Sequence, residues 1–414
     1  MIFRKRQHAI YQEPNVLESV AQYHHLFRLP ILSSPTLPST ERHQLQVSLL
    51  REEIEGLKTA IVESKSDLVP AANAFANLQY AIGRAVLEFG MGGLFLSMFD
   101  EVHRAHMSKI CNSRSEAEAT QRFHRSKKGI ESVIETVVPS LGPEDAATQS
   151  KWLVLRSKDH KMLKSVKYAP ANLSIIVTRA MEAAAQSASS SDSCSSHQSL
   201  PLFFLMASPG ALSSAAEHHA ALNGSMAPST TPKLPNKERC QWRLSILESK
   251  LKELENALAG EESVSDGSDD HKETLIRVAH CLTNMQYSLS ASVLEFGMAS
   301  LFQSIFDEVH RSRMSEACET VEEAQETIQH YLKEQERNQE PAPSVPTGTI
   351  MESPEEDDED EDDDSESSDY YYRQQQIQHG GMKWLVYQQG KNKVLKSVKH
   401  TPANLSGILI QSSC

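Results

Sequence analysis

Apolar side chains recur at spacings of three and four residues in two separate stretches of the chain. The first stretch contains Val47, Leu50, Ile54, Leu57 and Ile61, and the second contains Leu244, Leu247, Leu251, Leu254 and Leu258. This spacing is typical of the a and d positions of a coiled coil, here sustained for about two heptads. Because so short a helix is marginal in water by itself, each stretch is predicted to pack against another part of the protein.

Each apolar stretch precedes one copy of a longer repeated sequence. Residues 77–111 and 284–318 are identical at 21 of 35 positions without a gap. Farther along the chain, LKSVKYAPANLS at 163–174 returns as LKSVKHTPANLS at 395–406. Repetition on this scale indicates two copies of one structural unit.

Three helices are predicted in each copy. The middle one is the longest, because GMGG in the first copy becomes GMAS in the second, and Ala299 and Ser300 are compatible with an unbroken helix. Capping boxes at Ser113–Glu116 and Thr320–Glu323 predict where the third helix begins. The predicted helices span about 42–66, 71–111 and 113–138 in the first copy, and about 239–259, 273–318 and 320–338 in the second.

A small β-hairpin is predicted after the helices of each copy, at 151–177 and 383–410. The repeated KWLV sequence provides one strand and the LKSVK run the other, although LKSVK also fits a helical turn. A third strand is expected at 174–177 and 407–410, because the proline of the PANLS corner favours a turn just before it.

Composition sets the remaining boundaries. The predicted organisation is an irregular segment at 1–40, a first module at 41–180, a disordered Ser/Ala/Pro-rich linker at 181–237, and a second module at 238–414 that contains an acidic disordered insert at 339–378. Within the linker, LPLFFLM at 200–206 is expected to dock on the helices. The net charge of −14 is misleading, because residues 352–369 hold 13 acidic and no basic side chains, which leaves −1 for the rest.

Several classes of protein lack support in this sequence. The six cysteines form no C-x-x-C pair, which favours free buried thiols in a reducing compartment. No apolar run reaches the roughly 18 residues that a membrane span needs, so we expect a cytoplasmic or nuclear protein. The usual nucleotide-binding and catalytic motifs are missing. We therefore expect no enzymatic activity, no cofactor and no bound metal.

The FDEVHR sequence, which occurs at 99–104 and 306–311, is the first candidate site. On a helix Asp100 and His103 share a face, as do Asp307 and His310, and a carboxylate beside an imidazole suits acid–base chemistry or metal binding. One Asp and one His make only half a metal site, however. A structural Asp–His or Glu–Arg pairing that fixes helix packing is the preferred interpretation.

The basic hairpins are the second candidate site. Residues 151–168 and 383–400 each carry a net charge of +5 and one tryptophan, which suits nucleic acid or anionic lipid headgroups. A solvated lysine edge that prevents sheet aggregation is the simpler interpretation. Over both sites, the residues expected to contact a partner are Phe99, Asp100, His103, Arg104, Phe306, Asp307, His310, Arg311, Trp152, Lys161, Lys164, Lys167, Trp384, Lys393, Lys396 and Lys399.

Together these patterns predict an α-rich α+β fold of tandem duplicated three-helix, coiled-coil-like modules, each followed by a small basic β-hairpin, with disordered linkers. Because their apolar seams match, the modules are expected to pack on each other, within one chain or in a homo-oligomer. The predicted function is that of a non-enzymatic adaptor or scaffold for protein partners. The alternative is a nucleic-acid- or anionic-phospholipid-binding protein that uses the lysine-rich hairpins. In that case the acidic residues 355–364 are expected to fold over a basic hairpin and compete with the anionic partner. Phosphorylation of the nearby Ser353 would strengthen this competition.

Overall fold

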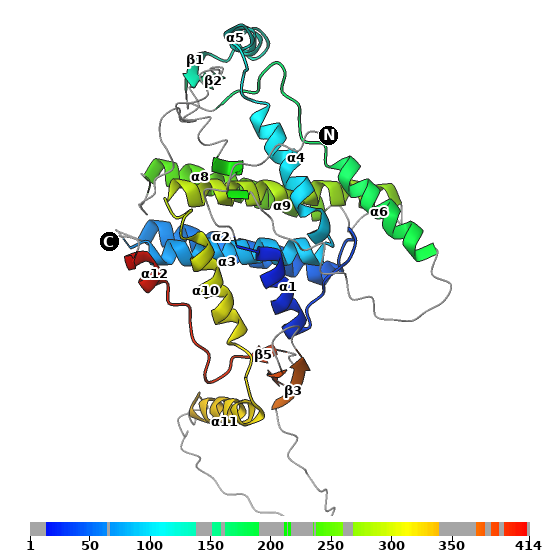
Figure 1. The fold of residues 1–414 in the computed structure, drawn as a ribbon, viewed down its shortest axis with the longest axis vertical. Helices are drawn as coiled ribbons and strands as arrows, with labels where there is room; N and C mark the ends of the chain where they lie inside the picture. Colours follow the sequence, from blue (N-terminus) through cyan, green and yellow to red (C-terminus); the bar gives the residue numbers. More distant parts are fainter. Residues whose placement is uncertain are drawn as a thin grey trace, which may run out of the picture. The chain divides into compact units, whose positions relative to one another are not determined.

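The computed structural model describes residues 14–63, 67–137, 151–158, 162–189, 211–212, 214–216, 235, 237–259, 268–338, 370–376, 382–388 and 393–411. The chain forms two compact units. Unit 1 comprises Met1–His24, Leu29–His310 and Asn404–Cys414, and unit 2 comprises His25–Arg28 and Arg311–Ala403. The fold is helix-rich with two small antiparallel sheets, in agreement with the general class predicted from the sequence (Figure 1).

Most helices belong to unit 1. They are α1 (Val16–Phe27), whose residues from His25 on belong to unit 2, α2 (Thr40–Glu63), α3 (Val69–Glu88), the short 3-10 helix η1 (Gly92–Leu94), α4 (Phe95–Met107), α5 (Arg114–Lys128), α6 (Ser174–Ser189), α8 (Lys237–Ala259), α9 (Ser268–Glu295), α10 (Phe302–Met314), which continues into unit 2, and α12 (Leu405–Gln411). Residues 211–212 and 214–216 are also helical.

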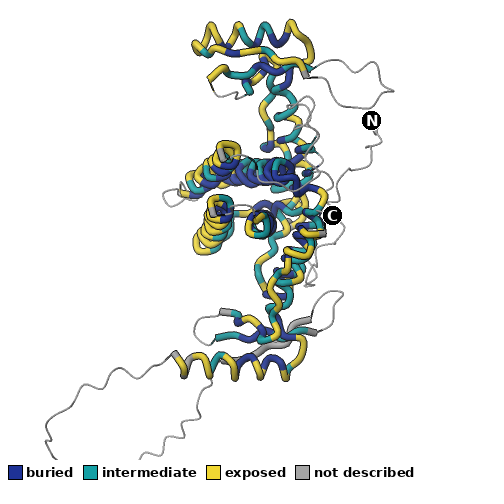
Figure 2. The backbone as a smooth tube through the Cα atoms, turned by 90° about the vertical axis from the view of Figure 1, so that its left-hand side faces the viewer, coloured by how far each residue is buried: buried dark blue, intermediate teal, exposed yellow. Residues whose placement is uncertain are grey.

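Four long helices form the core of unit 1. Helix α2 packs on α3, α8 packs on α9, and the two pairs meet through α2 with α8 and through α3 with α9. The apolar seams predicted from the sequence are buried in these contacts, at Leu50, Ile54, Leu57, Leu247, Leu251 and Leu254. Buried and exposed positions alternate along α2 and α8, whereas α3 and α9 are buried over most of their length. Figure 2 shows buried positions of the chain in dark blue and exposed positions in yellow.

The predicted long middle helix is broken in both copies. Helices α3 and α4 meet at an angle of 107°, and α9 ends at Glu295 before α10 begins at Phe302. Each break contains a glycine in the left-handed region, Gly90 at φ 66° and Gly297 at φ 69°. The prediction of a continuous helix was wrong because it rested on the residues that differ between the copies, whereas the shared glycine ends the helix.

The third helix of the first copy is shorter than predicted. The capping box is confirmed, since the Ser113 hydroxyl accepts a hydrogen bond from the Glu116 N–H at 3.2 Å. Helix α5, however, ends at Lys128 because Gly129 caps it with φ 60°. The residues after it, predicted as helix to 138, form strand β1 (Ser132–Val137).

The KWLV strand pairs mainly with residues that precede it in the chain. In unit 1, β1 pairs antiparallel with β2 (Lys151–Arg156). In unit 2, β3 (Tyr370–Gln376), β4 (Met382–Gln388) and β5 (Lys393–Leu395) form an antiparallel sheet in that order, beside α11 (Val321–Asn338). The predicted pairing with LKSVK is thus correct only for β5, and in the first copy it is reduced to a bridge between Leu155 and Met162.

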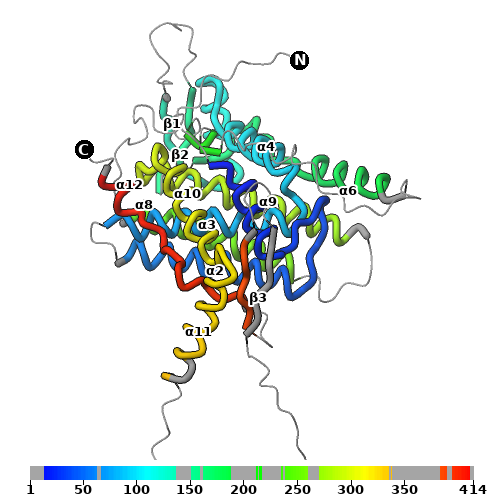
Figure 3. Tube along the Cα trace, turned by 60° about the horizontal axis from the view of Figure 1, so that its bottom comes forward, coloured from blue at the N-terminus to red at the C-terminus, as the bar shows by residue number. Residues whose placement is uncertain are grey.

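The residues after the PANLS corner form helices, so the predicted third strands at 174–177 and 407–410 are wrong. Helix α6 packs on α9, and α12 packs on α3 (Figure 3). Helix α6 begins at the serine of the corner, Ser174, and α12 begins at Leu405, directly after Asn404. Serine and asparagine are common where helices begin. Helix α6 continues to Ser189, into the segment predicted to be a linker.

Two other predictions on the connecting segments need revision. The N-terminal segment, predicted to be irregular over 1–40, contains α1, whose residues Val16, Leu17 and Val20 are buried. The linker at 181–237 also contributes to the core, because Leu212 and Ala215 are 3% and 1% exposed. The predicted docking segment 200–206 and most of the acidic insert, 339–369, lie outside the described residues.

Candidate functional site

The two copies of the repeated sequence meet through one pair of equivalent glutamines in unit 1. The side-chain amide of Gln79 donates to the Oε1 of Gln286 at 2.7 Å, and the amide of Gln286 donates back to Gln79 at 2.7 Å. Both side chains are buried, at 4% exposure. The two residues occupy the same position in 77–111 and 284–318. The contact is therefore reciprocal, as in an isologous interface on a twofold axis.

The neighbouring tyrosines repeat this exchange. The ring of Tyr80 stacks on Phe306 and His310 of the other copy, with centroid distances of 5.9 and 6.1 Å. The equivalent Tyr287 stacks on Phe99 and His103, at 5.7 and 6.2 Å. Four predicted partner-binding residues of the FDEVHR motifs thus take part in contacts between the two copies.

The aspartates of the two motifs lie apart from these rings. Asp100 and Asp307 are exposed, and Asp307 accepts a hydrogen bond from Gln303 at 2.7 Å. Across the described residues, no group of three or more His, Cys, Asp or Glu side chains is arranged to hold a metal ion. The geometry instead supports the predicted Glu–Arg pairing, because Arg104 donates two hydrogen bonds of 2.7 Å to Glu101.

This Glu–Arg pair fixes the second repeated motif. In the first copy the Glu101 carboxylate accepts the backbone N–H of Asn172 at 2.8 Å, and Arg104 donates to the carbonyl of Pro170 at 3.0 Å. The hydroxyl of Ser108 also bonds the backbone of Ala169. The FDEVHR and PANLS motifs therefore bind each other. We call this set of contacts the corner clamp.

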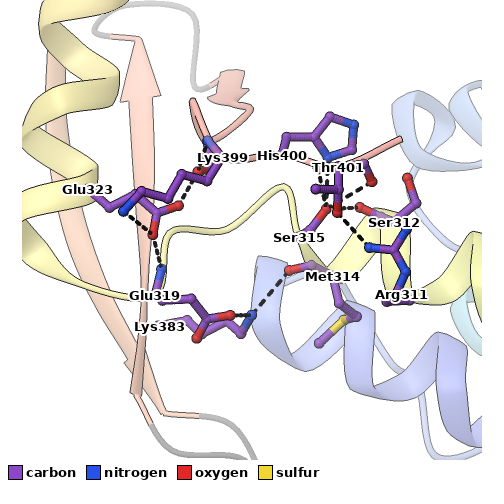
Figure 4. Close-up of polar contacts among 11 residues, drawn as sticks. Arg311, Ser312, Met314, Ser315, Glu319, Glu323, Lys383, Lys399, His400 and Thr401 are labelled. Atoms are coloured by element: carbon purple, nitrogen blue, oxygen red, sulfur yellow. Dashed lines mark hydrogen bonds and ion pairs between the residues drawn. The ribbon is translucent and has the colours of Figure 1, made fainter. Parts of the chain in front are cut away.

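The second copy makes corresponding contacts within each unit. Glu308 accepts the N–H of Asn404 at 2.7 Å within unit 1. In unit 2, Arg311 donates to the Thr401 hydroxyl at 2.5 Å and to the Pro402 carbonyl at 3.3 Å. Ser315 accepts the N–H of Thr401 and bonds the ring of His400 at 2.9 Å (Figure 4). The predicted partner residues Arg104 and Arg311 are thus engaged within the chain.

The LKSVK run docks on the capping box in both copies. The Ser165 hydroxyl donates to Glu116 at 2.5 Å, and Lys167 lies 3.5 Å from the same carboxylate. In unit 2 Ser397 donates to Glu323, and Lys399 lies 3.8 Å from it (Figure 4). One glutamate therefore serves a helix N-terminus, a serine and a lysine, which the sequence pattern alone did not reveal.

The hairpin tryptophans and lysines are also partly engaged. Trp152 packs against a cluster that contains Cys111 and Val154, and Trp384 packs against the equivalent cluster in unit 2. Lys164 lies 4.5 Å above the ring of Tyr168, and Lys396 lies 3.0 Å from Glu316. The side chains of Lys161 and Lys393 lie outside the described part of the chain.

Each copy also contains a buried carboxylate that the sequence analysis missed. Arg42 of α2 pairs with Glu88 at the end of α3. At the equivalent place Glu295 pairs with Arg239 and Arg243, both at 2.5 Å. Burial opposes ionisation of Glu295, but the two guanidinium groups hold the pKa of its carboxyl below the usual value. The signal in the sequence is a glutamate inside the apolar LEF triplet of both copies.

Two titratable groups, one on α4 and one on α9, have strongly shifted pKa values. The imidazole of His106 stacks on Tyr287 with a centroid distance of 4.1 Å. Burial, together with the neighbouring Lys109, lowers the pKa of His106 to about 3. Burial also raises the pKa of the Cys281 thiol to about 12. Cys111 and Cys318 are buried as predicted, and burial raises the pKa of both thiols.

No helix in the described part of the chain is by itself long and apolar enough to cross a membrane, although the bent pair of Val69–Glu88 and Gly92–Met107 meets that criterion when taken together. Comparison with protein-family models, with curated proteins and with solved structures finds no match to this chain.

Proposed function

We propose that this protein is a non-enzymatic scaffold in which two copies of one helical module, joined as a tandem duplication, pair within the chain and hold protein partners on their outer faces. The observation that carries this proposal is the reciprocal Gln79–Gln286 contact. It is supported by the use of the repeated motifs, since FDEVHR binds PANLS and LKSVK binds the capping-box glutamate. Polar side chains that hydrogen-bond to each other within the chain stabilise the fold, and this structural role favours a scaffold over an enzyme.

Affinity capture with full-length protein tests the scaffold. The variant Y80A/Y287A removes the rings that join the copies, whereas E52K changes an exposed charge on α2. We expect a set of proteins captured by the wild type and by E52K but lost with Y80A/Y287A. An identical set from all three proteins would contradict the proposal. So would a stoichiometric metal found by elemental analysis of the purified protein, because it would favour an enzyme.

A second candidate is polyanion binding, which one asymmetry favours. Helix α5 carries five basic and two acidic side chains, a net of +3, whereas the equivalent α11 carries two basic and five acidic, a net of −3. Arg122, Lys127 and Lys128 are exposed and have no ion-pair partner in the described residues. Nucleic acid or anionic lipid would then bind the basic surface formed by α5 and the hairpin of the first copy. The hairpin of the second copy, which lies beside the acidic α11, would bind it less well.

Salt titration separates this second candidate from the scaffold. Binding of a single-stranded oligonucleotide, and of vesicles that contain phosphatidylserine, is measured between low and high salt. For polyanion binding we expect a steep loss with salt, a further loss in K127E/K128E, and little change in the matched α11 variant K333E/R337E. Deletion of 355–364 is expected to strengthen the binding if that acidic run competes. A flat salt response would exclude this candidate.

A further inference from the structure

Two ion pairs join α2 of the first copy to α8 of the second copy in unit 1. Arg51 lies 2.8 Å from Glu255, and Lys58 lies 3.3 Å from Glu248. Hydrogen bonding to Glu55 and to Glu248 raises the pKa of Lys58. The pairs flank the buried seam leucines, because Arg51 follows Leu50 and Lys58 follows Leu57.

These two pairs are reciprocal. Alignment of the apolar seams places Leu50 on Leu247 and Leu57 on Leu254, so that Arg51 corresponds to Glu248 and Lys58 corresponds to Glu255. Arg51, at the first of the two positions, therefore pairs with Glu255, at the second position of the other copy. In the same way Lys58, at the second position, pairs with Glu248 at the first. The copies differ in sign at both positions, since the first copy is basic and the second is acidic.

The apolar and amide contacts make no such distinction. The seam leucines match in type, Gln79 and Gln286 are identical, and Tyr80 and Tyr287 are identical. Two first copies from different chains would bring together the same seam leucines, glutamines and tyrosines as the observed pair. They would, however, place Arg51 opposite Lys58 twice. Two second copies would place Glu248 opposite Glu255 twice.

We propose that positions 51 and 58 on α2 and positions 248 and 255 on α8 form a charge code that makes each copy the partner of the opposite copy and disfavours contact between two like copies. Facing charges of this kind select partners in coiled coils, where repulsion in the wrong pair matters as much as attraction in the right one. The code explains how surfaces that are otherwise self-complementary avoid joining one chain to the next. This inference concerns pairing alone and does not depend on the proposed scaffold function.

The expected energies are modest because the side chains are in contact with solvent. Arg51 and Glu255 are 53% and 35% exposed, and Lys58 and Glu248 are 46% and 43% exposed. Exposed ion pairs of this type are individually weak, because water and salt screen them. Selection arises from the difference between two attractive pairs and two repulsive pairs, which roughly doubles the effect of either alone.

Full-length charge variants test the code by thermal unfolding. R51E/K58E places four acidic side chains across the contact, and E248K/E255K places four basic ones. Each double variant is expected to lower Tm by about 2–5 °C. The combined variant R51E/K58E/E248K/E255K exchanges the signs and is expected to recover most of the loss of the two double variants, although the Lys58–Glu55 pair within α2 stays broken. In about 1 M salt, where the Debye length is roughly 3 Å, the differences are expected to shrink.

Two comparisons make the result decisive. The control variant E52K/K252E changes exposed charges on the same helices and keeps the net charge, so its Tm should match that of the wild type. An equimolar, co-refolded mixture of R51E/K58E and E248K/E255K chains should contain more heterodimer by light scattering than either chain alone contains dimer. Additive Tm losses in the combined variant, or equal dimer fractions in all samples, would overturn the charge code.

Discussion

Gln79 and Gln286 exchange two hydrogen bonds between the same atoms of equivalent side chains, each at 2.7 Å and each buried. A primary amide has one acceptor and two donor hydrogens, so a pair of glutamines can satisfy each other face to face. Such a pair specifies the register of two helices, as a single buried polar residue does in a coiled coil.

The first prediction concerns this pair. Q79L leaves the Gln286 amide buried without its partner, and we expect it to lower the free energy of unfolding by about 1–3 kcal/mol. The double variant Q79L/Q286L replaces both amides with apolar groups of similar size and should recover much of that loss. Chemical denaturation measures both effects. If the double variant were as unstable as the sum of the singles, the reciprocal contact would not be the cause.

The second prediction concerns the glycine at the helix break. A Cβ atom on Gly90 would lie 1.8 Å from the Ser34 carbonyl oxygen, at a φ of 66°. G90A should therefore destabilise the fold by more than about 1 kcal/mol. Gly56 in α2 is the matched control, because nothing lies within 4 Å of its Cβ position. G56A should raise stability by about 0.4–1 kcal/mol, and the opposite signs should appear as opposite shifts in Tm.

The third prediction concerns the pH dependence of stability. The pKa of His106 is about 3 in the folded protein and 6.5 in the unfolded chain. Between these values the unfolded chain binds a proton that the folded chain does not, so the free energy of unfolding falls as pH drops below about 6.5. H106F keeps a ring against Tyr287 and removes the titration. It should reduce the slope by up to about 1.4 kcal/mol per pH unit.

Denaturation midpoints at pH 7.5, 6 and 5 provide this measurement. Part of the slope should persist in H106F, because burial also lowers the pKa of His280. An unchanged slope in H106F would show that His106 titrates in the folded protein at its ordinary value.

The fourth prediction concerns the corner clamp. E101Q keeps the size of the side chain but weakens its bonds to Arg104 and to the N–H of Asn172. We expect a stability loss of about 1 kcal/mol and faster hydrogen exchange of the Asn172 amide. E308Q should act in the same way on the amide of Asn404. E118Q, on the exposed face of α5, should leave both amides unchanged.

Local signals in the sequence predicted the local parts of the fold. The spacing of Leu50, Ile54 and Leu57 identified a buried face, and the Ser113 capping box identified a helix start. The break at Gly90 was missed because a left-handed glycine and a helical glycine look alike in a sequence. The partner of β2 was missed because strand pairing depends on the position of β1, which had been assigned to the preceding helix.

The site was harder to predict because its contacts join distant segments. The sequence identified FDEVHR and PANLS as repeated, but Glu101 and Asn172 are far apart along the chain. Nothing in either motif states that one binds the other. Similarly, the aspartate and histidine of FDEVHR share a helix face in sequence terms, yet His103 faces Tyr287 of the other copy and Asp100 is exposed. Spacing along a helix shows on which face of the helix a residue lies, but not which residue of another segment it contacts.

A change in a residue that meets its own counterpart also changes the environment of that counterpart. Any substitution at Gln79 alters the surroundings of Gln286, and the same holds for Tyr80 and Tyr287, through the FDEVHR residues of the opposite copy. A substitution at one of these positions is therefore best tolerated together with a matching substitution in the other copy. Exposed positions away from these contacts and from the facing charges of α2 and α8 carry no such restriction, which leaves them open to separate roles in the two copies.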